Sequence, residues 1–517
     1  ATFLLGALSS DSSANSIPVQ RPRNNYVAMY FQDDFKVNRR LTLTLGIRWE
    51  YNGAVYDPDN RLSRYLDLTN PIPEFQTNVP QMPAAVTAIL KSQPIYNGAW
   101  VFTDSNHPGM WDVSKNTFMP RIGLAYRIND KNVLRAGWAR YIVPSNLLVD
   151  TLGSLSYPGF SATSTTLGLL QGVPQTYLSN PFPATNNPLI LPVGKSQGRY
   201  TNLGSAATWT SPDMRTQVND RIDVSFQRQL TADTMVEVAY FANRGFNVPY
   251  SLNLDQVDPQ YGYQYGSQIT KSVANPFYNI LPANQFYGSL RTQQNIPISS
   301  LLTPYPQYSS ITQTTTPGGG YYLNALKLQA RRQFKGGLTF LVSYAYMRSS
   351  QSQFFNADDQ FAGKFTLQDT ADPHHRLVMS GSYLLPVGKD RPFGSRMNPV
   401  LDAVLGGWAI SPIARYQSGI PLQFGQMDVL GDAKLDHPTP DRWFDTTKFV
   451  QSKAYTPRTN PWYLGLYGPR YVNVDASLAK FFPIGEKRKV ELRMETYNLT
   501  NSIMFDKPNL NVTSATF

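Results

Sequence analysis

Strict alternation of apolar and polar side chains is the feature that most limits how this chain can fold. In LTLTLGIRWEY, residues 41–51, apolar residues fill every odd position and Thr, Gly, Arg or Glu every even one. A period of two predicts a β-strand, because successive side chains of a strand point to opposite faces. This strand alone suits either a soluble sandwich, which buries its apolar face, or a membrane barrel, which turns that face to lipid.

The same alternation recurs along the whole chain. In MPRIGLAYRI, residues 119–128, the apolar face again opposes a face with two arginines. Such regularity over many segments favours one large sheet. The pattern predicts strands near 25–36, 41–51, 119–128, 132–141, 218–230, 233–244, 322–334, 337–348, 374–385, 404–418, 471–481 and 488–499.

The connections between these strands alternate between short and long. Turns of a few residues, such as TA at 231–232, are followed by long segments rich in Pro, Gly, Asn, Tyr and Ser. Structureless loops this long are uncommon in compact soluble domains, whereas outer-membrane barrels combine short periplasmic turns with long extracellular loops. The predicted external loops are 52–118, 142–217, 245–321, 349–373 and 419–470.

This asymmetry favours the membrane over the soluble sandwich. The sequence predicts an all-β fold, an antiparallel transmembrane β-barrel of which about 12 strands are visible. Trp49 and Tyr51 lie at the long-loop end of their strand, and Trp138 and Tyr141 near the corresponding end of theirs. We expect these aromatics in a girdle at the membrane surface; a place in the core of a soluble sheet is the alternative.

Composition supports a barrel and argues against several other classes. Charged residues make up 16% of the chain, against about 25% in soluble domains. The absence of Cys excludes disulfides and thiolate metal sites. The net charge of +11 comes from dispersed Lys and Arg residues, so no nucleic-acid partner is expected.

Three regions follow from the strand pattern. Residues 1–24 are predicted as an extracellular loop or the end of a preceding strand, residues 25–499 as barrel strands with their external loops, and residues 500–517 as the start of a last, truncated external loop. Open edges in lipid cost several kcal/mol for each unpaired backbone group. We therefore expect further strands beyond both ends, and hence a fragment of a larger barrel.

Several ordered stretches resemble one family. They are NNYVAMYFQDDFKVNRRLTLTLGIRWEYN, FMPRIGLAYRINDKNVLRAGWARY, DPHHRLVMSGSYLLPVGK, LGGWAISPIARYQSGIPL and VNVDASLAKFFPIGEKRKVELRMETYNLTNSIMFDKPN. Together they resemble the barrel portion of TonB-dependent outer-membrane transporters, most closely the Oar-like branch common in Acidobacteria and myxobacteria. The stretches are spread over residues 1–517 and keep the family's order.

The resemblance implies a 22-stranded barrel with a plug, and a coupling segment that contacts the TonB complex in the periplasm. This sequence shows neither plug nor coupling segment. The implied function is energy-coupled uptake of a scarce solute: an oligosaccharide, peptide or siderophore. The alternative is a non-transporting surface barrel that acts as an adhesin or scaffold for a partner protein. Either way we expect an outer-membrane location, loops facing outside, and contact with outer-membrane lipid and lipopolysaccharide.

No catalytic or metal-binding chemistry is expected. The histidines are His107, His374, His375 and His437, and the adjacent pair would point to opposite faces of a strand. PGGGYY at 317–322 is interpreted as the end of a loop because no helix follows it. We therefore predict no enzyme activity, no cofactor and no metal site.

Two sets of residues remain as site candidates. Charged residues on the polar sides of the strands are expected to face the lumen, as a solvated wall, as plug contacts or as a path for a polar or anionic substrate. They are Arg48, Glu50, Arg121, Arg127, Arg135, Arg221, Asp223, Glu237, Lys327, Arg331, Asp475, Glu491, Arg493 and Glu495. Aromatic residues of the external loops are candidates for ligand contact, or for packing that keeps the loops compact. They are Trp100, Trp111, Tyr261, Tyr263, Tyr265, Tyr321, Trp443, Trp462 and Tyr463.

Overall fold

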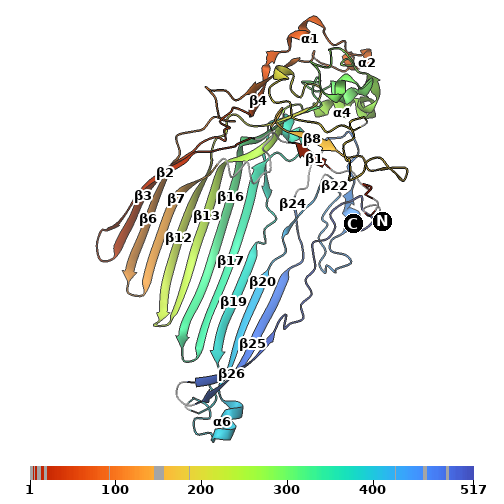
Figure 1. Ribbon diagram of the computed structural model, residues 1–517. Helices are drawn as coiled ribbons and strands as arrows, with labels where there is room; N and C mark the ends of the chain where they lie inside the picture. Colours follow the sequence, from red (N-terminus) through yellow and green to blue (C-terminus); the bar gives the residue numbers. More distant parts are fainter. Residues whose placement is uncertain are drawn as a thin grey trace.

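One large sheet dominates the structure, a computed structural model (Figure 1). Its main strands follow one another in space in chain order, and each is antiparallel to its neighbours, as the alternation predicts. They are β2 (Tyr26–Lys36), β3 (Leu41–Asn52), β6 (Phe118–Asn129), β7 (Asn132–Val143), β12 (Gln217–Thr231), β13 (Thr234–Asn253), β16 (Ser310–Lys335), β17 (Leu338–Gln353), β19 (His375–Leu384), β20 (Trp408–Gln417), β25 (Tyr471–Ile484) and β26 (Arg488–Thr496). The residues described are 4, 6–8, 13–16, 20–91, 93–144, 157–185, 187–389, 391–425, 427–457, 463–484 and 488–517.

Two more strands join this sheet, and small elements fill the connections. β11 (Ala206–Thr210) runs parallel to the start of β16, and β18 (Thr366–Asp369) pairs with the end of β17. The helices are α1 (Pro73–Thr77), α2 (Ala84–Thr87), α4 (Pro259–Tyr265), α5 (Ala357–Phe361), α6 (Pro399–Leu405), and the 3-10 turns η2 (Gly198–Tyr200), η3 (Gly266–Thr270), η4 (Ser289–Arg291), η5 (Ile298–Leu301) and η6 (Thr446–Lys448). The small strands are β1 (Ser13–Ser16), β4 (Ser63–Pro71), β5 (Asn97–Phe102), β8 (Ala162–Thr165), β9 (Leu169–Leu170), β10 (Val173–Pro174), β14 (Ser272–Ala274), β15 (Asn295–Pro297), β21 (Pro421–Gln423), β22 (Asp428–Val429), β23 (Phe449–Val450) and β24 (Tyr463–Tyr467). Within the described ranges, every helix is too short or too polar to span a bilayer.

Short and long connections lie at opposite ends of the sheet, as predicted. Figure 1 shows α1, α2 and α4 together at the long-loop end and α6 at the other end. Turns of a few residues, such as those joining β2 to β3 and β6 to β7, occupy the α6 end. Between β25 and β26, residues 485–487 lie outside the described residues.

β13 and β16 are much longer than a bilayer requires. A barrel strand crosses with about 9–11 residues, whereas β13 has 20 residues and β16 has 26. Their connection is therefore 254–309 rather than the predicted 245–321, and PGGGYY lies inside β16, not at a loop end. The register shifts around Val248 explain this, since a Cβ on Gly319 would lie 2.7 Å from the Val248 carbonyl oxygen. Glycine at a bulge lets the strand continue there.

One predicted strand, 404–418, begins too early. Val404 and Leu405 are the last residues of α6, and β20 starts at Trp408. Pro399 occupies the first turn of the helix, and the Asn398 side chain accepts a hydrogen bond from the Leu401 backbone N–H at 2.8 Å. Proline at the start and a capping Asn favour a helix over a strand.

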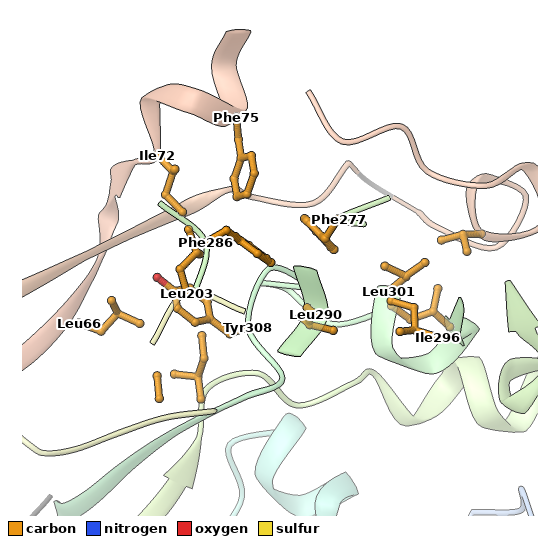
Figure 2. Packing of buried hydrophobic residues seen from close by; sticks show 14 of the residues in the cluster. Leu66, Ile72, Phe75, Leu203, Phe277, Phe286, Leu290, Ile296, Leu301 and Tyr308 are labelled. Atoms are coloured by element: carbon orange, nitrogen blue, oxygen red, sulfur yellow. The ribbon is translucent and has the colours of Figure 1, made fainter. Parts of the chain in front are cut away.

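The long-loop end holds the main hydrophobic core (Figure 2). Phe75 of the 53–117 connection, Leu203 of the 157–216 connection and Phe277 of the 254–309 connection are all buried in it. We call the described residues of these three connections the cap. Because these connections are far apart in sequence, the cap is one folded body rather than three independent loops.

The 419–470 connection has a smaller core of its own. Phe444 and Phe449 are buried there, and the ring of Phe517 lies 5.5 Å from each of theirs. Residues 500–517 thus pack on this connection without forming a strand.

The sheet has two open edges. Among the described residues, β2 and β26 each pair on one side only and not with each other. In lipid, such edges require further strands to satisfy their backbone groups.

Candidate functional site

All the charged residues predicted to face the lumen lie on one face of the large sheet. Residues that oppose each other across antiparallel strands share a face, and Ala139 of β7 opposes both Arg121 of β6 and Arg221 of β12. The same register links the other members from β3 to β26. We call this the polar face. The apolar face, which carries Ile122 and Ile222, is the opposite one.

Two arginines of the polar face surround one tyrosine. The guanidinium carbons of Arg121 and Arg221 lie 5.3 and 4.8 Å from the centroid of the Tyr141 ring. Within the described ranges neither arginine forms an ion pair, and the buried Nε of Arg121 has no hydrogen-bond partner. Two uncompensated guanidinium groups on one aromatic ring present planar donors that suit carboxylate or phosphate groups.

Other charges of the polar face neutralise one another. Arg48 pairs with Glu50, and Arg493 lies 2.5 Å from Glu491 and 3.6 Å from Glu495. Partly exposed pairs of this kind contribute only about 0–1 kcal/mol each. Such mutually neutralising ion pairs are typical of a solvated barrel wall.

The other predicted lumen residues either contact their neighbours in the sheet or have no contact that would help to hold a ligand. Arg127 lies 4.0 Å from Asp130, Lys327 lies over the ring of Phe241, Glu237 accepts a hydrogen bond from Gln227, and Asp475 accepts one from the Asn498 backbone N–H. Arg135, Asp223 and Arg331 complete the face. The Arg121–Tyr141–Arg221 cluster is therefore the strongest candidate for ligand contact.

Sequence reasoning missed several residues of the polar face, of which three are Tyr141, Arg376 and Arg415. Tyr141 was expected in the membrane girdle, but its odd position on β7 puts it on the polar face beside Arg121. Arg376 and Arg415 also lie there, through their pairing with Ala345 and Val378. Strict application of the period of two to β7, β19 and β20 would have found all three. Trp49, by contrast, lies on the apolar face at the long-loop end, where its Nε1 donates to the Lys115 carbonyl at 2.9 Å.

Three of the predicted loop aromatics are buried. Trp100 packs edge-on against Trp209 at 6.0 Å in the cap, where Tyr261 is also buried, and Trp111 belongs to a small separate core. The Nε1 atoms of Trp100 and Trp111 are buried without a hydrogen-bond partner among the described residues. These three residues hold the loops together rather than face solvent.

The other aromatics are distributed over several places. Tyr263 hydrogen-bonds to Asp358 of α5, Tyr265 packs on the rim of the cap core, Tyr321 lies in β16, and the Trp443 Nε1 donates to the Tyr467 carbonyl at 2.7 Å. Tyr463 begins β24, and Trp462 lies outside the described residues. No common ligand site joins those described.

The adjacent histidines have separate partners. His375 begins β19, and its Nδ1 lies 2.7 Å from the Tyr344 hydroxyl. His374 is buried against the ring of Tyr467 at 5.5 Å. In the part of the chain that the structure describes, no group of three or more His, Asp or Glu side chains is placed to hold a metal ion.

One carboxyl group of the cap, that of Asp255, has a strongly raised affinity for protons. Asp255 follows β13 and is 5% exposed. Burial raises its pKa to about 7, although its side chain accepts a hydrogen bond from the Tyr305 backbone N–H at 2.9 Å. In the part of the chain that the structure describes, the second Asp255 carboxylate oxygen is buried without a hydrogen-bond partner. The neutral form is therefore favoured in the folded cap.

The family profile of the outer membrane beta-barrel domain matches residues 1–517. The chain belongs to this family, and its location is the outer membrane. Among curated proteins, none matches.

The solved structures to which this chain is similar have very low sequence identity to it. The outer-membrane transporter YddB from Escherichia coli is 9% identical over 93% of this chain, with a TM-score of 0.41. The ferripyoverdine receptor of Pseudomonas aeruginosa is 11% identical over 93%, with a TM-score of 0.37, and the alcaligin receptor FauA from Bordetella pertussis is 11% identical over 92%, with a TM-score of 0.36. This chain spans 42%, 35% and 43% of those proteins, respectively.

Proposed function

We propose that this chain forms part of the barrel wall of an Oar-like, TonB-dependent transporter that takes up a scarce solute. The solute is an oligosaccharide, a peptide or a siderophore that reaches the polar face from the outside. Further strands, a plug and the segment that contacts the TonB complex belong to the rest of a longer protein. The TonB complex pulls on the plug and so opens a path along the polar face.

The observation that carries this proposal is the Arg121–Tyr141–Arg221 cluster. Three adjacent strands place two guanidinium groups and an aromatic ring on one patch of the polar face. Because no carboxylate compensates these arginines within the described ranges, the patch attracts an anionic or hydroxyl-rich solute. The cluster thus favours a conduit with a contact point over a wall of mutually neutralised charges.

Lipopolysaccharide is the proposed partner at the outer rim of the apolar face. Arg140, which shares that face with Ile222, forms a bidentate pair with Asp220 at 2.7 Å close to the long-loop end. Arg348 occupies a comparable position and pairs with Asp369 at 3.1 Å. Guanidinium groups at this height suit the phosphate groups of lipopolysaccharide.

Uptake by cells that produce the full-length protein tests the proposal. Cells with the wild type or the Arg121→Gln/Arg221→Gln double variant are given a mixture of siderophores, oligosaccharides and peptides, and depletion is followed by mass spectrometry. We expect one solute class to be depleted by the wild type only when TonB is active, and about tenfold more slowly by the double variant, equivalent to roughly 1.4 kcal/mol. Arg442→Gln, an exposed loop arginine that pairs with Asp445, is the control and should behave as wild type. TonB-independent depletion, or none at all, would contradict the proposal.

The cap supports the second candidate, a surface scaffold without transport. Its buried core makes it a folded platform able to present a binding surface to a protein partner. Capture of one defined partner by cells that produce the protein, together with unchanged solute depletion in the absence of TonB activity, would favour this function.

A further inference from the structure

The connection between β19 and β20 is unlike the other described turns at its end of the sheet. The turns β2–β3, β6–β7 and β12–β13 contain only a few residues, whereas this connection runs from 385 to 407 and includes α6 (Figure 1). A hairpin at this end needs only a few residues to reverse the chain. The additional residues therefore form a feature of their own at the periplasmic rim.

Side chains of the apolar face hold α6 in place. The Trp408 Nε1 donates to the Val404 carbonyl at 2.8 Å, and the Lys480 ammonium donates to the Gly406 carbonyl. Trp408 and Lys480 oppose each other on β20 and β25, and both lie on the apolar face with Ile410. The carboxyl end of α6 is therefore fixed against the side of the sheet that faces lipid.

α6 has two different sides. Asp402, Ala403 and Gly406 line a cavity of about 930 Å³ between the helix and the ends of β19, β20, β25 and β26. The Asp402 side chain closes the connection on this side by accepting a hydrogen bond from the Lys389 backbone N–H at 2.6 Å. This side of the helix thus faces other parts of the protein across the cavity.

The other side of α6 is apolar and exposed. Val400 and Val404 are 75% and 61% exposed, and Leu401 and Leu405 are 48% and 47% exposed. Their spacing of one and four residues places them on one stripe of a helix. None of them belongs to a hydrophobic core of the described residues.

We propose that this stripe is seated in the periplasmic leaflet of the outer membrane, so that α6 is an interfacial anchor of the barrel. The stripe continues the lipid-facing surface, on which Tyr383 and Phe482 also lie at this end of the sheet. Arg396 of the same connection is exposed and lies outside the cavity lining, so its charge complements anionic phospholipid headgroups. A short helix with an apolar stripe and an adjacent basic residue is suited to lie in the plane of the interface.

This inference rests on the outer-membrane location and not on transport. A lipid contact beside β19 and β20 fixes the height of the periplasmic rim in the bilayer. It also holds the helix over the cavity that opens toward the polar face.

Spin labels on single cysteines measure whether the stripe enters lipid. The sequence shown contains no Cys, so Val404→Cys and its neighbour Ala403→Cys, on the cavity side, form a matched pair in the full-length protein with any other cysteine replaced. Ile410→Cys and Ser411→Cys, on the apolar and polar faces of β20, calibrate lipid and water. The protein is reconstituted in vesicles of phosphatidylethanolamine and phosphatidylglycerol, and collisions with oxygen and with a water-soluble nickel chelate are compared.

We expect the label at 404 to lie about 5–10 Å below the headgroups, with an oxygen-to-nickel collision ratio close to that at 410. The label at 403 should resemble that at 411. A label at 404 as accessible to nickel as that at 411, in protein with the electrophoretic mobility of the folded barrel, would overturn the proposal. Protection at 404 that requires a periplasmic protein would overturn it as well. Loss of the transport phenotype with an unchanged label depth would leave the anchor intact and remove only the transport proposal.

Discussion

The sheet and the cap are stabilised in opposite ways. Strands of the sheet are neighbours in sequence, and their side chains point to two faces without an enclosed core. The cap buries Phe277 and Phe286 completely, with partners from three connections far apart in sequence. A membrane strand needs only its ladder and the correct side chain on each face, whereas the cap depends on close packing as soluble domains do. Substitutions should therefore be sensitive to face in the sheet and to burial in the cap.

The largest effect is expected from removing a central aromatic ring of the cap. Phe277 is 0% exposed and lies 5.9 Å from the Phe75 ring and 6.2 Å from the Phe286 ring (Figure 2). We expect Phe277→Ala to lower the free energy of unfolding of the cap by about 3–5 kcal/mol. Hydrogen exchange should accelerate in 254–309 but not in the membrane strands.

The adjacent Tyr278 provides the control for that experiment. It is 42% exposed, so Tyr278→Ala should change exchange little. Equal loss of protection in the cap and in β12 would show that the two regions unfold together and would remove the contrast between them.

A charge placed on neighbouring residues of one strand tests the two faces of the sheet. Leu328 opposes Val238 and Tyr344 on the apolar face, whereas Gln329 opposes Glu237 and lies on the polar face. Arg in place of Leu328 should destabilise the folded barrel in lipid vesicles by about 2–4 kcal/mol, because the charge enters the bilayer near its middle. Gln329→Arg should be close to neutral in urea titrations of the full-length protein. Equal effects would mean that the faces are wrongly assigned.

The stability of the cap should depend on pH through Asp255. Its pKa is raised from 3.8 to about 7 by burial, so the folded cap binds this proton more tightly than the unfolded chain does. The contribution is complete below pH 3.8 and declines as the pH rises to about 7. We expect a loss of about 4 kcal/mol over that window, measured by hydrogen exchange in 254–309. Asp255→Asn should abolish this dependence, and an unchanged dependence in that variant would assign it to another group.

A smaller effect is expected where the backbone closely approaches a buried hydroxyl. A Cβ on Gly98, whose φ is +157°, would lie 2.2 Å from the Tyr308 hydroxyl oxygen. Gly98→Ala should therefore destabilise the cap by about 1–2 kcal/mol. The Tyr308 hydroxyl has no hydrogen-bond partner within the described ranges, so Tyr308→Phe alone should be nearly neutral. The double variant should recover part of the loss in thermal unfolding, and a purely additive result would show that the clash lies elsewhere.

The sheet could be predicted from the sequence because the pattern within each strand depends on that strand alone. A period of two assigns each residue to a face, so the strands, the long-loop end and the shared face of the predicted lumen charges follow without any knowledge of partners. Tyr141 was misplaced because its aromatic character was given more weight than its odd position beside Ala139. The early start of 404–418 had a similar origin, since the capping of α6 by Asn398 interrupts the alternation.

The candidate site also has a part that the sequence predicts and a part that only the structure shows. The polar face was predictable, but the meeting of Arg121 and Arg221 over one ring depends on the register between three strands, which single-strand patterns do not give. The loop aromatics were ambiguous in sequence because no periodicity separates a packing residue from a ligand contact.

What the sequence alone determined is a membrane sheet with one apolar and one polar face, because in lipid the backbone must pair within the sheet and the side-chain pattern selects the faces. Only the tertiary structure decided that three distant connections share one core, which aromatics are buried in it, and that α6 leaves its apolar stripe uncovered. Those outcomes depend on which segments meet in space, and contact between distant segments produces no periodic pattern in the sequence.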